Sequence, residues 1–105
     1  MQESTIDLSP AATATPDADR GVYGISVAAE LVGMSEQSLR FYETRDLLLP
    51  DRTPGGTRRY SANDLVRLRR IGQLLDAGLN LAGIAMVLHL EAENAQLREE
   101  KEGLS

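Results

Sequence analysis

Two short apolar stripes with helical spacing, separated only by Gly33 and Met34, constrain the fold of this chain most strongly. The first stripe follows Ser26, a candidate N-cap, and Gly33 can take the left-handed conformation that ends a helix. The second stripe follows Ser35, another candidate N-cap. Two short helices joined by so tight a turn predict a helix-turn-helix.

The segment after Pro50 predicts a β-hairpin. Its centre, residues 54–56 (Pro-Gly-Gly), breaks helix and supplies turn conformations, while Thr57 and Tyr60 favour extended backbone. A hairpin that follows a helix-turn-helix has the place of a wing. The predicted fold class is therefore mainly α, a winged helix-turn-helix with a small β-hairpin wing and a C-terminal helix.

Two further helices are expected after the hairpin. Ser61 and Asp64 have the spacing of a capping box, and Gly78 is the expected stop of the helix that they open. Asn80 is the expected cap of the next helix. The expected buried stripes are Leu65, Leu68, Ile71 or Gly72, and Leu75 on the first, and Ile84, Val87 and Leu88 on the second.

A seven-residue leucine repeat follows in the C-terminal segment. The candidate dimerisation residues of this seam are Val87, Leu90, Asn94, Leu97 and Leu104, with Lys101 in register. A solvated, frayed helix is the alternative, because two heptads are too few to decide. The expected organisation is a disordered acidic tail over 1–20, a winged helix-turn-helix domain over 21–88, and a dimerisation helix or frayed tail over 89–105.

Charge is distributed unevenly along the 105 residues, although the net charge is −5. Residues 1–19 carry four acids and no Lys or Arg, and residues 71–105 sum to −4. Residues 20–70 hold nine arginines against six acids, which gives +3. A planar guanidinium can grip phosphate or guanine edges with two hydrogen bonds, so the basic centre indicates a nucleic-acid partner.

Composition argues against other functions. The chain has no Cys and one His, so thiol chemistry, disulfides and a metal site are not expected, and no cofactor is predicted. It shows no Gly-rich phosphate loop and no nucleophile with its base, so an enzyme is not expected. Neither a signal sequence nor a membrane span is recognisable, and we expect a cytoplasmic protein.

The arginines divide into two groups. Arg40, with Gln37 and Arg45 nearby, lies in the second helix of the helix-turn-helix, which would enter a major groove. Arg58 and Arg59 follow the Gly-Gly turn on the wing, where they could contact phosphate. Three others on the following helix are better interpreted as a solvated face, with phosphate contact as the alternative; they are Arg67, Arg69 and Arg70.

These features occur in a recognisable order. The runs Ile25–Met34, Leu39–Glu43, Leu47–Arg52, Gly56–Ser61 and Gly78–Ile84 resemble the MerR family of transcription factors, and within it the HspR-type heat-shock repressors. The resemblance covers about residues 22 to 90. It implies a dimer that binds a palindromic promoter element and can bend and untwist the DNA.

Carried over by position, the resemblance implies DNA-binding roles for the recognition helix and the wing. The residues concerned, together with those argued above, are Ser35, Gln37, Ser38, Arg40, Phe41, Tyr42, Arg45, Arg58 and Arg59. Tyr60 matches an aromatic that packs the wing onto the core. Phe41 and Thr57 stand where many members have Tyr, so two phosphate contacts would be missing.

The implied partners are double-stranded promoter DNA, a second copy of the chain, RNA polymerase, and a DnaK-type chaperone acting as co-repressor. Without Cys the chain lacks the thiolates that metal-sensing members use. A MerR-like module that binds a chaperone or a J-domain protein without DNA is the alternative function. Exposed arginines at positions 40, 58 and 59 together favour the DNA-binding interpretation.

Overall fold

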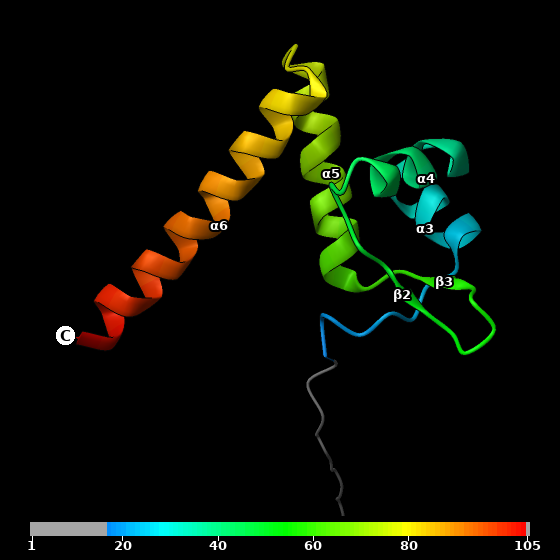
Figure 1. Ribbon diagram of the computed structural model, residues 1–105, viewed down its shortest axis with the longest axis horizontal. Helices are drawn as coiled ribbons and strands as arrows, with labels where there is room; N and C mark the ends of the chain where they lie inside the picture. The colour runs from blue at the N-terminus through cyan, green and yellow to red at the C-terminus, as the bar shows by residue number, and fades with distance from the viewer. Residues whose placement is uncertain (1–16, 105) are drawn as a thin grey trace, which may run out of the picture.

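The computed structural model describes residues 17–104, and within them the chain forms four helices and one small sheet that lies beside α3, α4 and α5 (Figure 1). The helices are α3 (Ile25–Val32), α4 (Glu36–Thr44), α5 (Ala62–Asp76) and α6 (Leu81–Leu104). The strands β2 (Asp51–Arg52) and β3 (Arg58–Arg59) pair antiparallel, with Arg52 opposite Arg58. The predicted fold class, a mainly helical winged helix-turn-helix, is confirmed.

The turn between α3 and α4 follows the sequence signals at its centre. Gly33 has φ +70°, and the Ser35 hydroxyl accepts a 3.0 Å hydrogen bond from the Ser38 amide. The prediction that Ser26 caps α3 is wrong, because the helix already begins at Ile25, with Gly24 in the cap position. Tyr23 is bridged to Tyr60 in the sheet region, which makes Gly24 the first residue free to enter the helix.

Helix α5 is capped as expected. Ser61 and Asp64 form a reciprocal capping box with hydrogen bonds of 2.8 and 2.9 Å. Its buried stripe continues through Leu74, whereas Leu75 is exposed, so that part of the prediction is wrong. The helical repeat from Ile71 places Leu74, three residues on, toward the core. Gly78, with φ +93°, follows the helix end.

The core lies where α3 and α4 meet α5 and the first turns of α6. Ile84 and Leu88 of α6 are buried, and Val87 is partly buried against the same cluster. The core residues are Ala28, Ala29, Leu39, Tyr42, Leu47, Leu48, Tyr60, Leu65, Leu68, Ile71, Leu74, Ile84 and Leu88. At an order of 2 kcal/mol for each large side chain, this burial outweighs any single surface contact.

The chain before α3 is attached to the domain. The backbone amide of Tyr23 donates to the Tyr60 carbonyl, and Tyr60 returns a 2.7 Å bond. Further back, the Asn63 amide donates to the Ala18 carbonyl, and the Asn63 side chain donates to Asp19. The expected disordered tail over 1–20 therefore differs from the structure over residues 17–20, while residues 1–16 lie outside the described residues.

Helix α6 continues without a break from the core into solvent (Figure 1). The described side chains of residues 89–103 are all exposed, and the side chain of Leu104 lies outside the described residues. The helix diverges from α5, so the two form the arms of a V. Within residues 17–104, every helix is too short or too polar to cross a membrane.

Candidate nucleic-acid interface

Helix α4 presents one face to solvent. Gln37, Arg40 and Phe41 are exposed, spaced three and four residues apart, while Leu39 lies in the core. Arg40 donates to Glu36 at 3.3 Å, an exposed pair one turn apart that holds the guanidinium only weakly. This face therefore offers an amide, a guanidinium and an apolar ring to a ligand.

An arginine and an aromatic ring are stacked at the end of this face. The guanidinium carbon of Arg45 lies 5.4 Å from the centroid of the Phe41 ring, although Phe41 remains 44% exposed. Such a cation–π contact orients Arg45 along the helix without using its hydrogen-bond donors. Both residues are thus available for contact.

The N-terminal serines of α4 are already engaged in capping. Ser35 accepts from the Ser38 amide, and its hydroxyl donates to the Ser38 hydroxyl at 2.9 Å. These bonds satisfy an otherwise orphaned helix amide. The two hydroxyls therefore have fewer free hydrogen-bonding positions for contact with DNA.

Tyr42 differs from the expectation. Its side chain is 8% exposed and belongs to the core, so little of it is available to DNA. The reason is helical geometry, because Tyr42 lies three residues after the fully buried Leu39 and shares its face. Tyr42 is therefore a core residue and not part of the candidate interface.

Glu43 joins the recognition helix to the wing. Its carboxylate accepts a 2.5 Å hydrogen bond from Nε of Arg58 and a 2.7 Å bond from Nη2 of Arg52. Arg52 also donates to the Gly56 carbonyl in the hairpin turn at 3.0 Å. We call this arrangement the Glu43 bridge. It holds α4 and the hairpin together as one basic surface.

The bridge resolves a charge conflict in the sheet. Arg52 and Arg58 are directly opposite each other in the register, and like charges in that position destabilise a strand pair. Partial burial alone raises the pKa of the Glu43 carboxyl, but the hydrogen bonds and charges of Arg58 and Arg52 outweigh this, and the net pKa is lowered. The Glu43 hydrogen bond raises the pKa of Arg58.

Sequence reasoning missed both Glu43 and Arg52 as functional residues. The signal was present in the hairpin itself, because the Pro-Gly-Gly turn sets a register in which two arginines face each other. Such a pair needs a carboxylate nearby. Only the folded chain identifies that carboxylate as one that lies fifteen residues from Arg58.

The wing arginines are less exposed than expected, because Arg58 and Arg59 are both half-buried. The guanidinium of Arg59 lies near Gly24, where a Cβ atom would be 3.2 Å from Nη1. Tyr60 is fully buried, which confirms the expected packing of the wing onto the core. Its hydroxyl has no hydrogen-bond partner among the described residues, and burial raises its pKa.

The arginines of α5, which were expected to form a solvated face, instead connect α5 to other parts of the chain through hydrogen bonds. Nε of Arg67 donates to the Leu47 carbonyl, and Arg69 donates to the carbonyl of Leu31 near the end of α3. Arg70 binds Glu91 of α6. These contacts use donors that a phosphate contact would need.

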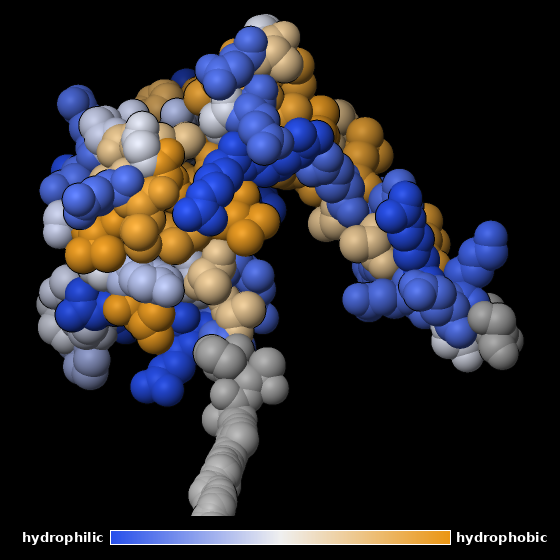
Figure 2. Space-filling model, turned by 180° about the vertical axis from the view of Figure 1, so that it is seen from behind, coloured by the Kyte–Doolittle hydropathy of each residue, from blue (hydrophilic) through white to orange (hydrophobic). Residues whose placement is uncertain are grey.

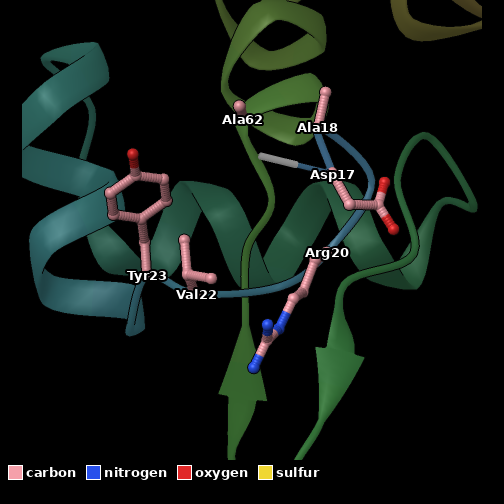
Figure 3. Close-up of a pocket in the computed structure, with 6 residues that line it drawn as sticks. All are labelled: Asp17, Ala18, Arg20, Val22, Tyr23 and Ala62. Atoms are coloured by element: carbon pink, nitrogen blue, oxygen red, sulfur yellow. The ribbon is translucent and has the colours of Figure 1, made fainter. Parts of the chain in front are cut away.

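A small pocket beside the start of α5 shows no catalytic arrangement. It has a volume of about 320 Å³ and is lined by Asp17, Ala18, Arg20, Val22, Tyr23 and Ala62. In Figure 3 the Asp17 carboxylate and the Arg20 guanidinium point in different directions. In the part of the chain that the structure describes, no group of three His, Asp or Glu side chains could hold a metal ion.

Comparison with known proteins identifies the family. Residues 23–91 match the MerR HTH family of regulatory proteins, so the match includes α3, α4, the wing, α5 and the buried part of α6. The chain belongs to the MerR family. The recognition helix, the wing and the Glu43 bridge are therefore parts of a MerR domain.

Individual MerR relatives agree with this assignment. The chain is 51% identical over 81 residues to the heat shock protein HspR of Streptomyces coelicolor, an alignment covering 76% of this chain and 54% of HspR. It thus spans about half the length of that relative. It is 37% identical over 87 residues to the HTH-type transcriptional regulator GlnR of Bacillus cereus, covering 80% of this chain and 67% of GlnR.

A solved MerR structure is similar in both fold and sequence. HiNmlR, a MerR family regulator lacking the sensor domain, crystallised bound to promoter DNA. It aligns with a TM-score of 0.65 and 31% identity, over 78% of this chain and 63% of that chain. GlnR is by name a transcriptional regulator and HiNmlR a MerR family regulator, and the fold of the present chain is one that binds promoter DNA in HiNmlR.

Proposed function

We propose that this MerR-family protein is a sequence-specific regulator of transcription that binds double-stranded promoter DNA as a homodimer. The observation that carries the proposal is the Glu43 bridge, which joins the exposed face of α4 to an arginine-bearing wing. A groove-reading helix beside a phosphate-binding ribbon is an arrangement suited to duplex DNA. The HiNmlR complex with promoter DNA supports the same partner.

The two elements have different proposed roles. Gln37, Arg40 and Phe41 on α4 read base edges or thymine methyl groups in the major groove, and Arg45 supports them from the next turn. On the wing, Arg58 and Arg59 contact phosphate. Nε of Arg58 donates to Glu43, so the two Nη groups are the donors that would bind a phosphate.

The proposed dimer forms through the exposed part of α6. Leu90 and Leu97 are 52% and 63% exposed and lie seven residues apart. Figure 2 shows apolar side chains along one edge of this helix, flanked by hydrophilic ones. A second copy would bury this stripe, with Asn94 within it and Val87 at its core end. A palindromic operator follows from the two-fold symmetry of such a dimer.

Sedimentation of charged variants tests the dimer. Leu90→Glu with Leu97→Glu should give a monomer at micromolar concentration, whereas Glu99→Gln on the opposite face of α6 should not change the mass. A monomeric wild type would contradict the proposal. A dimer that both leucine substitutions leave intact would instead move the interface elsewhere.

The identity with the heat shock protein HspR supports a role in the stress response. We propose that in this role the protein is a repressor, with a DnaK-type chaperone as co-repressor and RNA polymerase as the machinery affected. We infer that the protein acts in the cytoplasm, where promoter DNA lies. Expression of the genes beside its operators, measured before and after heat shock in a deletion strain, tests this role. Unchanged transcript levels would refute the stress-response role without contradicting DNA binding.

Selection of the intact protein against a random duplex library tests DNA reading directly. We expect the selected duplex to be palindromic. The affinity for it should fall steeply with salt concentration, because each phosphate contact releases counterions from the DNA. Absence of enrichment, with weak and salt-sensitive binding only, would favour a chaperone-modulating module. In that case capture of a J-domain protein would be measured next.

A further inference from the structure

The two arms of the V formed by α5 and α6 are joined across their opening by an ion pair. Arg70 donates from Nε to both Glu91 oxygens at 3.1 and 3.2 Å, and from Nη2 to Oε2 at 2.6 Å. Gln73, one turn along α5, accepts from Nη1 of Arg70 at 3.0 Å and fixes the guanidinium further. The hydrogen bond with Arg70 lowers the pKa of the Glu91 carboxyl.

The position of this pair along α6 allows it to affect the direction of the exposed part of that helix. The apex of the V is the turn at Gly78, and the last buried apolar side chain along α6 is Leu88. Glu91 lies beyond Leu88, and the described side chains after it are exposed. Leu97 is a further 9 Å or so along the helix at about 1.5 Å per residue, so a small change of angle at Glu91 is amplified there.

The groove inside the V provides little else to hold the angle. It has a volume of about 690 Å³ and is open, with small side chains on the α6 wall such as Ala92 and Ala95. Val66 on the α5 wall is largely exposed. The polar link therefore acts where apolar packing has ended.

We propose that Arg70 and Glu91 are positioning residues that set the angle between α5 and α6, and thereby the spacing of operator half-sites that the dimer accepts. This inference rests on the proposed function, because it requires that α6 pairs with a second copy. The recognition helix α4 of each protomer then moves with α5, because both helices belong to the same packed core. A change of the V angle in each protomer changes the distance between the two recognition helices.

The angle can be measured without DNA. Since the chain has no cysteine, Ala62→Cys on α5 and Glu99→Cys on α6 would carry the only two spin labels in each protomer. A narrow distance distribution is expected for the otherwise native chain. Arg70→Glu should shift or broaden it, and Arg70→Glu combined with Glu91→Arg should restore it. Mixing with excess unlabelled protein separates distances within a protomer from those between protomers.

Glu93→Gln is the matched control, because it removes an exposed carboxylate of α6, which lies 3.4 Å from His89 of the same helix, and leaves the Arg70–Glu91 pair in place. Distances unchanged by Arg70→Glu, in a variant whose thermal unfolding is native-like, would overturn the proposal. A broadening by Glu93→Gln equal to that by Arg70→Glu would overturn it as well.

Half-site spacing supplies the second measurement. A duplex library with fixed half-sites and a variable spacer should give the wild type one preferred spacing. Arg70→Glu should weaken that preference by about two- to fivefold per protomer, the range for an exposed ion pair, and the charge-swapped double variant should recover it. Affinity for a single half-site should not change, which separates this role from a general loss of structure.

The two measurements distinguish the failure of the inference from that of the function beneath it. If wild type enriches no duplex, DNA reading fails and the spacing role falls with it, while the label distances still report whether the ion pair sets the angle. If the distances respond but the preferred spacing does not, DNA reading stands and the inference is overturned.

Discussion

Nε of Arg58 on the wing lies 2.5 Å from a carboxylate oxygen of Glu43 on the recognition helix. The same carboxylate binds Arg52, which faces Arg58 across the hairpin. One acidic side chain thus neutralises a repulsive cross-strand pair and ties the guanidinium of Arg58 to α4. In a surface otherwise rich in arginine, this carboxylate stabilises the geometry of the proposed phosphate-binding group.

Glu43→Gln should loosen the wing. Loss of the charge leaves Arg52 and Arg58 opposed without compensation, and we expect a cost of about 1 kcal/mol in unfolding free energy. Hydrogen exchange should quicken at the hairpin amides of Thr53 and Thr57, which bond across the turn. Exchange in α5 should stay slow.

Glu36→Gln is the matched control for this change, because it removes an exposed pair with Arg40 on the same helix. Equal acceleration of hairpin exchange in both variants would show that the wing does not depend on the Glu43 bridge.

Acid should weaken the contribution of Glu43 to stability. Its pKa is lowered in the folded chain from an ordinary value of 4.5, so the folded state binds its proton less readily than the unfolded state. The stabilisation is therefore complete above about pH 4.5 and is lost as the pH falls through the lowered pKa. The stability difference between wild type and Glu43→Gln, from urea unfolding at about pH 7 and about pH 3, should shrink toward acid. A difference that grows toward acid would contradict this sign.

Arg40→Ala and Arg58→Ala should affect DNA binding differently. Loss of the wing arginine should weaken binding to all duplexes alike and reduce the salt slope by about one for each phosphate that is no longer neutralised. Loss of Arg40 should also change the preferred bases, at about 1–3 kcal/mol of discrimination. Titrations of each variant against the selected duplex and a scrambled one, at several salt concentrations, check this. Identical patterns in both variants would refute the division of roles.

Tyr60→Phe should leave the protein as stable as before or up to about 1 kcal/mol more stable, because the buried hydroxyl lacks a partner among the described residues. Urea unfolding measures the difference. Tyr42→Phe, at the other buried tyrosine of the core, is the comparison. A marked loss of stability in Tyr60→Phe would mean that its hydroxyl is bonded, for example to a buried water.

Gly21→Ala should detach the segment before α3 from the sheet. A Cβ atom there would lie 2.4 Å from the Arg59 carbonyl oxygen and 2.8 Å from Cβ of Asp51, so we expect a loss of about 1–3 kcal/mol. Gly55→Ala, whose Cβ would meet only Thr53 Oγ1 at 3.9 Å, is the control. Thermal unfolding of both variants measures this loss. Equal unfolding midpoints for Gly21→Ala and Gly55→Ala would mean that the segment is not packed closely against the sheet.

Local sequence signals were enough to predict where most helices begin and end and which fold they build. Gly33, Ser35 and the Ser61–Asp64 capping box act within three residues of themselves, so their effects can be predicted from local chemistry. The hairpin follows equally from its Pro-Gly-Gly turn. The resemblance to the MerR family, carried by runs of residues along the chain, is confirmed by the family match.

The pairing of distant charges and the burial of individual aromatic rings could be seen only in the folded chain. The partners Glu43 and Arg58 are fifteen residues apart, Arg70 and Glu91 twenty-one, and Asp19 and Asn63 forty-four. The start of α3 after Gly24 and the burial of Tyr42 likewise depend on the sheet and on the packed core. Such contacts arise from packing between elements, and the periodicity of a single helix contains no information about which neighbour will cover it.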